Sequence, residues 1–127
     1  MPASLHTSEN MKKKLLTIWI IFVFILLTIP MPPAASAVVN DITFSDKVVH
    51  FFMFGIFSSL LIYSYRDRYK NNALFLMSIL LGAVYAALGE FIQSFLPTRT
   101  SSLNDFYAGA LGSLIFVIIY YVRVKKA

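Results

Sequence analysis

The chain has 127 residues, of which 58% are hydrophobic and only 13% are charged. Ordinary soluble domains are about 25% charged, and a chain this short cannot hide so much apolar surface in a water-soluble core. The composition excludes a disordered chain, disfavours a soluble enzyme and favours a bilayer protein. The absence of cysteine excludes disulfides, thiol catalysis and Cys-ligated zinc.

Four long apolar segments follow one another at residues 15–31, 48–65, 74–95 and 103–122. Each is close to the roughly 20 residues that a helix needs to cross about 30 Å of hydrocarbon. Backbone polar groups in lipid must be satisfied within the segment, so these segments should be helices. The prediction is an all-α, membrane-embedded four-helix bundle over residues 15–122. Residues 1–14 are expected to form an N-terminal tail, and residues 1–11 of this tail are expected to lack regular structure. Residues 123–127 form a basic C-terminal tail.

The first segment has a second interpretation, because a basic start and an apolar run also characterise signal peptides. Ala35-Ser36-Ala37 matches the small-x-small cleavage pattern, so residues 1–37 could be removed. The apolar run is long for a signal peptide and the cleavage pattern follows three prolines, which favours a retained helix. Both interpretations stay open at this point.

Charge predicts the orientation of the bundle. If the Lys12–Lys14 end faces the cytoplasm, nine of the eleven basic residues lie inside, and only Lys47 and Arg99 lie outside. This distribution satisfies the positive-inside rule at every loop and places both termini in the cytoplasm. Because topology accounts for the basic excess, nucleic acid is not expected as a partner. The expected partner is the lipid bilayer, and the oligomeric state is left open.

Small residues recur at helix-packing spacing, in the pairs Gly55/Ser59, Gly82/Ala86, Ala108/Gly112 and Gly109/Ser113. Such pairs usually allow two helices to approach closely in a membrane. A second pattern is a group of tyrosines at the predicted cytoplasmic ends, as in the aromatic belts of membrane proteins. Both patterns predict a compact bundle, and neither indicates a catalytic or binding role.

Asp46 and His50 stand at the predicted external end of the second helix. They are four residues apart and therefore share a helix face. A carboxylate beside an imidazole can orient it for acid–base work, since histidine titrates near neutral pH. Alternatively, the helix dipole favours Asp46 near the N-terminus, and His50 is an interfacial hydrogen-bonding residue.

Glu90 and Gln93 share a face in the last turns of the third helix. Glu90 lies five residues before the end of the segment, about 8 Å deep at 1.5 Å per residue. A carboxylate at that depth needs a partner, and we expect an ion pair with Arg99 or His50. The alternative is a buried bridge between helices without chemistry.

The link to the fourth helix carries four more candidates, Arg99, Ser101, Ser102 and Asp105. Arg99 is a planar donor suited to phosphate or carboxylate groups, although arginine also snorkels at interfaces. Ser102-Leu103-Asn104-Asp105 fits the S-x-x-D capping box before an apolar run. Capping is a sufficient reason for both residues, but it leaves open a second role for Asp105 in an external cleft.

The predicted site is therefore a set of polar residues at the two external helix ends. The candidate acid–base residues are Asp46, His50, Glu90 and Asp105, and the candidate substrate-binding residues are Lys47, Gln93, Arg99, Ser101 and Ser102. Two acids and a histidine could also bind a divalent metal. No spacing among them is diagnostic, so neither a metal nor a cofactor is predicted.

Two blocks of this sequence resemble the VanZ-like family. Asp46-Lys47-Val48-Val49-His50-Phe51 is similar to its D-K-x-x-H-F opening, and residues 90–105 are similar to its E-x-x-Q-x-F-x-P-G-R-x-x-S-x-x-D block. The resemblance covers roughly residues 15–122. The chain departs from the pattern at Thr98, where the family usually has Gly, and at Gly109, where it usually has Asn.

The resemblance implies a small, multi-pass integral protein of the bacterial cytoplasmic membrane, in a family named for resistance to the glycopeptide teicoplanin. We therefore expect action at the external leaflet, on or with an anionic envelope lipid or a lipid-bearing glycopeptide. One alternative is a non-catalytic bundle whose polar residues lock the helices together. A further alternative is a small proton-coupled transporter using Glu90 and His50, which the apolar middle of the helices disfavours.

Overall fold

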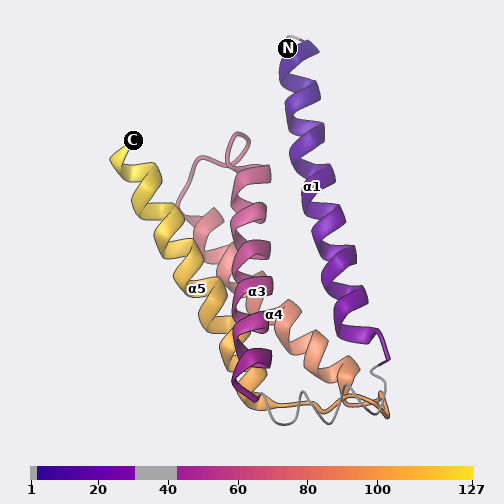
Figure 1. Ribbon diagram of the computed structural model, residues 1–127. Coiled ribbons are helices and arrows are strands. Elements are labelled where there is room, and N and C mark those ends of the chain that lie inside the picture. Colours follow the sequence, from indigo (N-terminus) through magenta and orange to yellow (C-terminus); the bar gives the residue numbers. More distant parts are fainter. Residues whose placement is uncertain (1–2, 31–42) are drawn as a thin grey trace.

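The computed structural model describes residues 3–30 and 43–127. This part of the chain contains four helices and no strand: α1 (Ala3–Thr28), α3 (Thr43–Tyr65), α4 (Ala73–Gln93) and α5 (Leu103–Lys126). The predicted all-α, four-helix architecture is confirmed (Figure 1). The cleavage pattern Ala35-Ser36-Ala37 lies outside the described residues.

The prediction of an irregular N-terminal tail is wrong, because α1 is helical from Ala3. Three contacts stabilise this part of α1. Glu9 and Lys13 form an i,i+4 ion pair at 2.7 Å, a spacing that supports a helix. Lys12 is bound by two residues outside α1. Its Nζ lies 2.5 Å from Oδ2 of Asp67, and its carbonyl oxygen accepts a hydrogen bond from the Ser64 hydroxyl.

The other helix ends shift by a few residues. The helix α3 begins at Thr43, five residues before the predicted segment, and its first turn contains Asp46. An acidic side chain in the first turn is favoured by the helix dipole. The helix α5 continues to Lys126 with three basic residues in its last turn, where the dipole favours cations.

The helices α3, α4 and α5 pack against one another, and α1 lies against α3 and α4. The N- and C-termini lie at the same end of the bundle, together with the loop between α3 and α4 (Figure 1). The link between α4 and α5 lies at the opposite end. We call these the terminal end and the site end.

Three helices are long and apolar enough to cross a membrane: Asp46–Tyr65, Ala73–Gln93 and Leu103–Lys126. In α1 the apolar run begins only after Lys14, which leaves residues 15–28 of the described helix for the hydrocarbon. Large apolar side chains stay exposed on the outer faces, for example Ile18, Phe91 and Ile118. Such a surface suits lipid and not water.

Small residues set the helix spacing, as predicted. A Cβ on Gly112 of α5 would overlap the carbonyl oxygen of Phe51 in α3, so only glycine allows this approach. Beside it, Ser113 donates a hydrogen bond to the carbonyl of Phe54, and Ser58 donates one to Ser78. These interhelical bonds satisfy buried hydroxyls in the bundle centre.

Tyrosines and basic residues gather at the terminal end, also as predicted. Lys12 lies over the ring of Tyr63, and Arg66 lies over Tyr120 and bonds its hydroxyl at 3.3 Å. The bundle is therefore polarised along its axis. Basic and aromatic side chains lie at one end, and the candidate site residues lie at the other.

Candidate functional site

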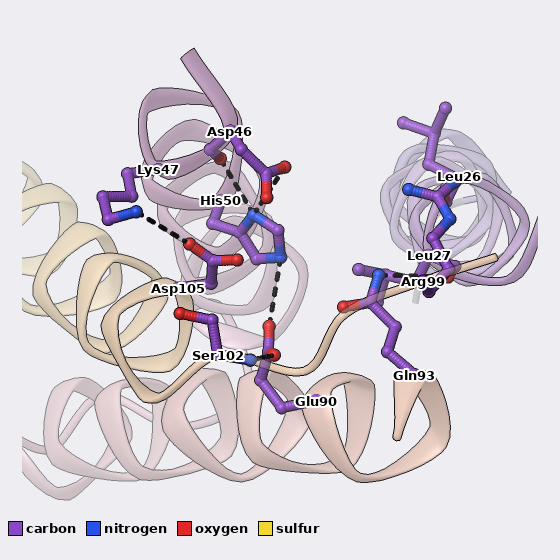
Figure 2. A network of polar contacts seen from close by, with 10 residues as sticks. All are labelled: Leu26, Leu27, Asp46, Lys47, His50, Glu90, Gln93, Arg99, Ser102 and Asp105. Carbon is purple, nitrogen blue, oxygen red and sulfur yellow. Dashed lines mark hydrogen bonds and ion pairs between the residues drawn. The ribbon is translucent and has the colours of Figure 1, made fainter. Parts of the chain in front are cut away.

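The site is assembled from three helices at the site end. The first turns of α3 contribute Asp46, Lys47 and His50, the last turns of α4 contribute Glu90, and the start of α5 contributes Asp105. Figure 2 shows the side chains of these residues pointing toward one another. His50, Glu90 and Asp105 are more than nine-tenths buried, whereas Asp46 and Lys47 are partly exposed.

His50 lies between two acidic residues. Its Nδ1 is 2.9 Å from the backbone carbonyl of Asp46 and 3.6 Å from Oδ1 of the Asp46 side chain. Its Nε2 is 3.3 Å from Oε1 of Glu90. The predicted contact of Glu90 with His50 is therefore present, and the i,i+4 spacing places Asp46 beside the imidazole as expected. Both ring nitrogens face oxygen, which fixes the orientation of the ring.

Glu90 also caps the next helix. Its Oε2 accepts a hydrogen bond from the backbone N–H of Ser102 at 2.7 Å. Ser102 is the N-cap residue of α5, but its side chain makes no capping hydrogen bond. The predicted capping box between Ser102 and Asp105 is therefore wrong. A carboxylate from α4 takes the N–H that Asp105 would have bonded, and Asp105 is free to turn into the cluster.

Asp105 meets the α3 residues. Its Oδ1 is 3.5 Å from Nζ of Lys47, and its carboxylate lies near both Asp46 and His50. Ligand-type atoms of Asp46, His50 and Asp105 all lie within 4.8 Å of one another. The site thus holds three carboxylates, one imidazole and one ammonium group.

Arg99 and Gln93 lie apart from this cluster, at the end of α1 (Figure 2). The guanidinium of Arg99 donates to the carbonyl oxygens of Leu26 and Ile29 at 2.8–3.1 Å, and Gln93 donates to the carbonyl of Leu27 at 3.1 Å. The last carbonyls of a helix lack intrahelical partners. Both side chains therefore cap α1, and the alternative expectation of a Glu90–Arg99 pair is not what the structure contains.

The remaining predicted positions lie at the edge. Ser101 is exposed, and Ser102 contributes its backbone N–H. Gly109 is buried one turn after Asp105, where a Cβ would lie 2.6 Å from the Phe54 ring and 3.1 Å from Ala86. An asparagine at this place would displace the buried Phe54 ring, so the departure at Gly109 accompanies a different packing beneath the site.

The capping of α1 was not predicted, because its acceptors are backbone carbonyls that carry no side-chain pattern. Chemically, the cluster offers an oriented imidazole, carboxylates for proton transfer or metal binding, and one ammonium group for an anion. These features define a helical bundle with membrane-compatible helices and a buried acid–histidine site at one end.

The profile of the VanZ/LLP1 family matches residues 2–124. An uncharacterized protein of the fission yeast Schizosaccharomyces pombe is 36% identical over 127 residues, covering 97% of this chain and 73% of the yeast protein. No solved structure matches the chain. The chain belongs to the VanZ/LLP1 family.

Proposed function

We propose that this VanZ-like protein acts at the external leaflet, on or with an anionic lipid headgroup or a lipid-bearing glycopeptide. The observation that carries the proposal is the imidazole of His50, buried at the site end and flanked by Asp46 and Glu90. Ionisable groups at membrane depth are expensive and mark functional sites by default. In this proposal His50 transfers protons, with Asp46 and Glu90 orienting it and Lys47 attracting the anion.

The orientation is supported by charge. The basic residues of the terminal end satisfy the positive-inside rule if that end is cytoplasmic, and the cluster then faces the outer leaflet. The match to a fission yeast protein favours a substrate that eukaryotic cells also contain. Lipid headgroups meet that condition, whereas glycopeptide resistance is the narrower expectation that comes from the family's name.

A non-catalytic bundle is the second candidate, and the α1 cap favours it. Arg99 and Gln93 bind backbone carbonyls of α1, which is a structural role. In this alternative Glu90 only closes the N-terminus of α5, and the polar residues of the site end hold four helices in register.

Glu90→Gln separates the two candidates. The amide keeps an acceptor for the Ser102 N–H but removes the charge beside His50. Cells with the wild-type protein, Glu90→Gln and the matched control Asp67→Asn at the terminal end are compared by lipidomics and glycopeptide susceptibility, with membrane abundance monitored. The proposal expects a changed lipid profile or susceptibility in Glu90→Gln alone, at normal abundance. No change in either readout would refute it, and a change that follows lowered abundance supports the structural bundle.

A further inference from the structure

The cluster contains buried polar atoms whose hydrogen bonds are not made. In the described part of the chain, these are Nε2 of His50, Oε1 of Glu90 and Oδ1 of Asp105. Oδ1 of Asp105 has only the long ion pair with Lys47 at 3.5 Å, and Nε2 of His50 and Oε1 of Glu90 face each other at 3.3 Å. Buried polar groups without hydrogen bonds are costly, so three in one cluster indicate a missing component. The missing component is a proton or a cation, because two of the three atoms are carboxylate oxygens.

The two contacts of the His50 ring cannot both be hydrogen bonds if the ring is neutral. A backbone carbonyl only accepts, so the 2.9 Å contact with Asp46 places a hydrogen on Nδ1. In the neutral imidazole Nε2 then carries a lone pair, and it faces Oε1 of Glu90 at 3.3 Å. In a neutral ring with this tautomer, two acceptors therefore face each other, and only a further proton or a change of tautomer removes the conflict. Moving the hydrogen to Nε2 would turn this contact into a bond with Glu90 and would leave Nδ1 as a ligand.

Two carboxylate side chains, those of Asp46 and Asp105, lie close to the ring. Nδ1 is the nitrogen near Asp46, at 3.6 Å from its Oδ1, and ligand atoms of Asp46, His50 and Asp105 lie within 4.8 Å of one another. Neighbouring ligand atoms in a tetrahedral zinc site are about 3.3 Å apart, given bonds of about 2.0–2.1 Å. Side-chain movements of about 1 Å would therefore bring the three atoms to ligand distances.

We propose that Asp46, His50 and Asp105 bind a divalent transition-metal ion of the zinc or manganese type. Glu90 then accepts the Nε2 hydrogen, as carboxylates do behind metal-bound histidines. One imidazole and two carboxylates suit these borderline ions. Asp46 is 38% exposed on its side chain, so an ion can enter past it from the site end.

The metal ion also resolves a charge conflict. Three carboxylates repel an anionic headgroup. In the described structure the Lys47 ammonium pairs with one of them, Asp105, whereas the Arg99 guanidinium binds α1. A bound divalent ion would supply the positive charge that an anion needs. This last step rests on the proposed function, but metal binding itself does not.

The test uses the full chain in lipid nanodiscs, purified with a histidine-free tag and dialysed with Zn²⁺ or Mn²⁺ before removal of unbound ion. Elemental analysis of the wild-type protein is expected to give about one ion per chain. Asp105→Asn and His50→Gln should bind at least about 100-fold more weakly, since changes behind the ligands alone cost 10–100-fold. His6→Gln is the matched histidine control and should bind like the wild type. Lys47→Met should bind at least as tightly, because it removes a competing cation.

A cobalt titration of the wild-type protein still tests the metal site if a variant does not fold. Co²⁺ added to the wild-type protein should give a visible absorption band that one equivalent of Zn²⁺ removes. Less than about 0.1 ion per chain, no cobalt band, or equal binding by a folded Asp105→Asn would overturn the metal site and leave a shared proton in its place. Metal binding without any change in lipid profile or glycopeptide susceptibility would refute the proposed function alone. A change in either readout without metal binding would refute the metal site alone.

Discussion

The carboxylate of Glu90 closes the N-terminus of α5 by accepting the backbone N–H of Ser102 at 2.7 Å. The same carboxylate faces the His50 imidazole with its other oxygen. One side chain therefore joins the last turns of α4 to the start of α5 and to the histidine of α3. Changes at Glu90 act on the site and on the helix arrangement at once.

The stability of the bundle should depend on whether the side chain at position 90 keeps a hydrogen-bond acceptor for the Ser102 N–H. Glu90→Ala leaves the Ser102 N–H without its partner and should lower the free energy of unfolding by about 1–3 kcal/mol. Glu90→Gln keeps an amide oxygen as acceptor and should lose about 1 kcal/mol or less, which is the net value of one hydrogen bond. Thermal unfolding in detergent compares the two. Equal losses would show that the bond to Ser102 does not hold the helix.

Arg99 should control the attachment of α1. Arg99→Ala removes three contacts to the carbonyls of Leu26 and Ile29 and should weaken the packing of α1 by about 1–3 kcal/mol. Because the chain has no cysteine, a cysteine pair across α1 and α4 reports this packing by its rate of disulfide cross-linking. Arg123→Ala at the other end is the control and should cross-link like the wild type. An unchanged cross-linking rate in Arg99→Ala would contradict the role of Arg99 in holding α1 and would favour its predicted role in anion binding.

Gly112 and Gly55 provide a matched pair for close packing. In Gly112→Ala the new Cβ would overlap the Phe51 carbonyl, and α3 and α5 must separate. In Gly55→Ala the Cβ meets only side-chain atoms of Phe116, at 2.5–2.9 Å, and a side chain can shift more easily than a backbone carbonyl. We expect a loss of about 1–3 kcal/mol for Gly112→Ala, as for other overpacked cores, and a smaller loss for Gly55→Ala. Thermal unfolding measures both, and the reverse order would contradict the assigned role of the backbone contact.

The Lys12–Asp67 pair should set the pH range over which α1 is held at the terminal end. The hydrogen bond from Lys12 lowers the pKa of Asp67 below 3.8, so the stabilisation is complete above pH 3.8 and is lost as the pH falls through the lowered value. The same bond raises the pKa of Lys12 above 10.5, so its contribution is lost only above that pH. Carbon-13 NMR titration of the Asp67 carboxyl should give a midpoint below 3.8, and Lys12→Met should raise it. The Asp67 carboxylate is exposed, so the effect of the pair on stability should stay below about 1 kcal/mol.

Cysteine labelling tests the orientation directly. Single cysteines at Asn71 in the α3–α4 loop and Ser101 in the α4–α5 link lie at opposite ends of the bundle. A membrane-impermeant maleimide added to intact cells should label Ser101→Cys and leave Asn71→Cys unlabelled until the cells are opened. The opposite pattern would invert the topology and place the site in the cytoplasm.

Hydropathy was sufficient to predict four helices, because the bilayer restricts a spanning chain to a small choice of structures. Spacing within one helix correctly placed Asp46 beside His50, and the depth of Glu90 correctly indicated a buried partner. The features of the site that could not be predicted share one cause, which is their dependence on contacts between different helices. The S-x-x-D pattern is local, and it cannot show that Glu90, twelve residues earlier, takes the N–H of Ser102. Likewise, the approach of Asp105 to Asp46 depends on the packing of α5 on α3, which no spacing contains.

The helix α1 is fastened to the bundle through main-chain atoms. Arg99 and Gln93 donate to its last carbonyls, and the Tyr85 hydroxyl donates to the carbonyl of Ile20. Main-chain acceptors are the same for every amino acid, so these fastenings do not depend on which apolar residues α1 contains. Side chains of α1 hold it as well, because Val23 and Leu27 lie in the buried core and the Trp19 indole donates to the carbonyl of Met53. A foreign apolar helix of equal length, grafted in place of residues 15–28, should therefore be accepted if it keeps these three side chains and presents the same carbonyls at its terminus. The first helix is in this sense exchangeable only on its outer face.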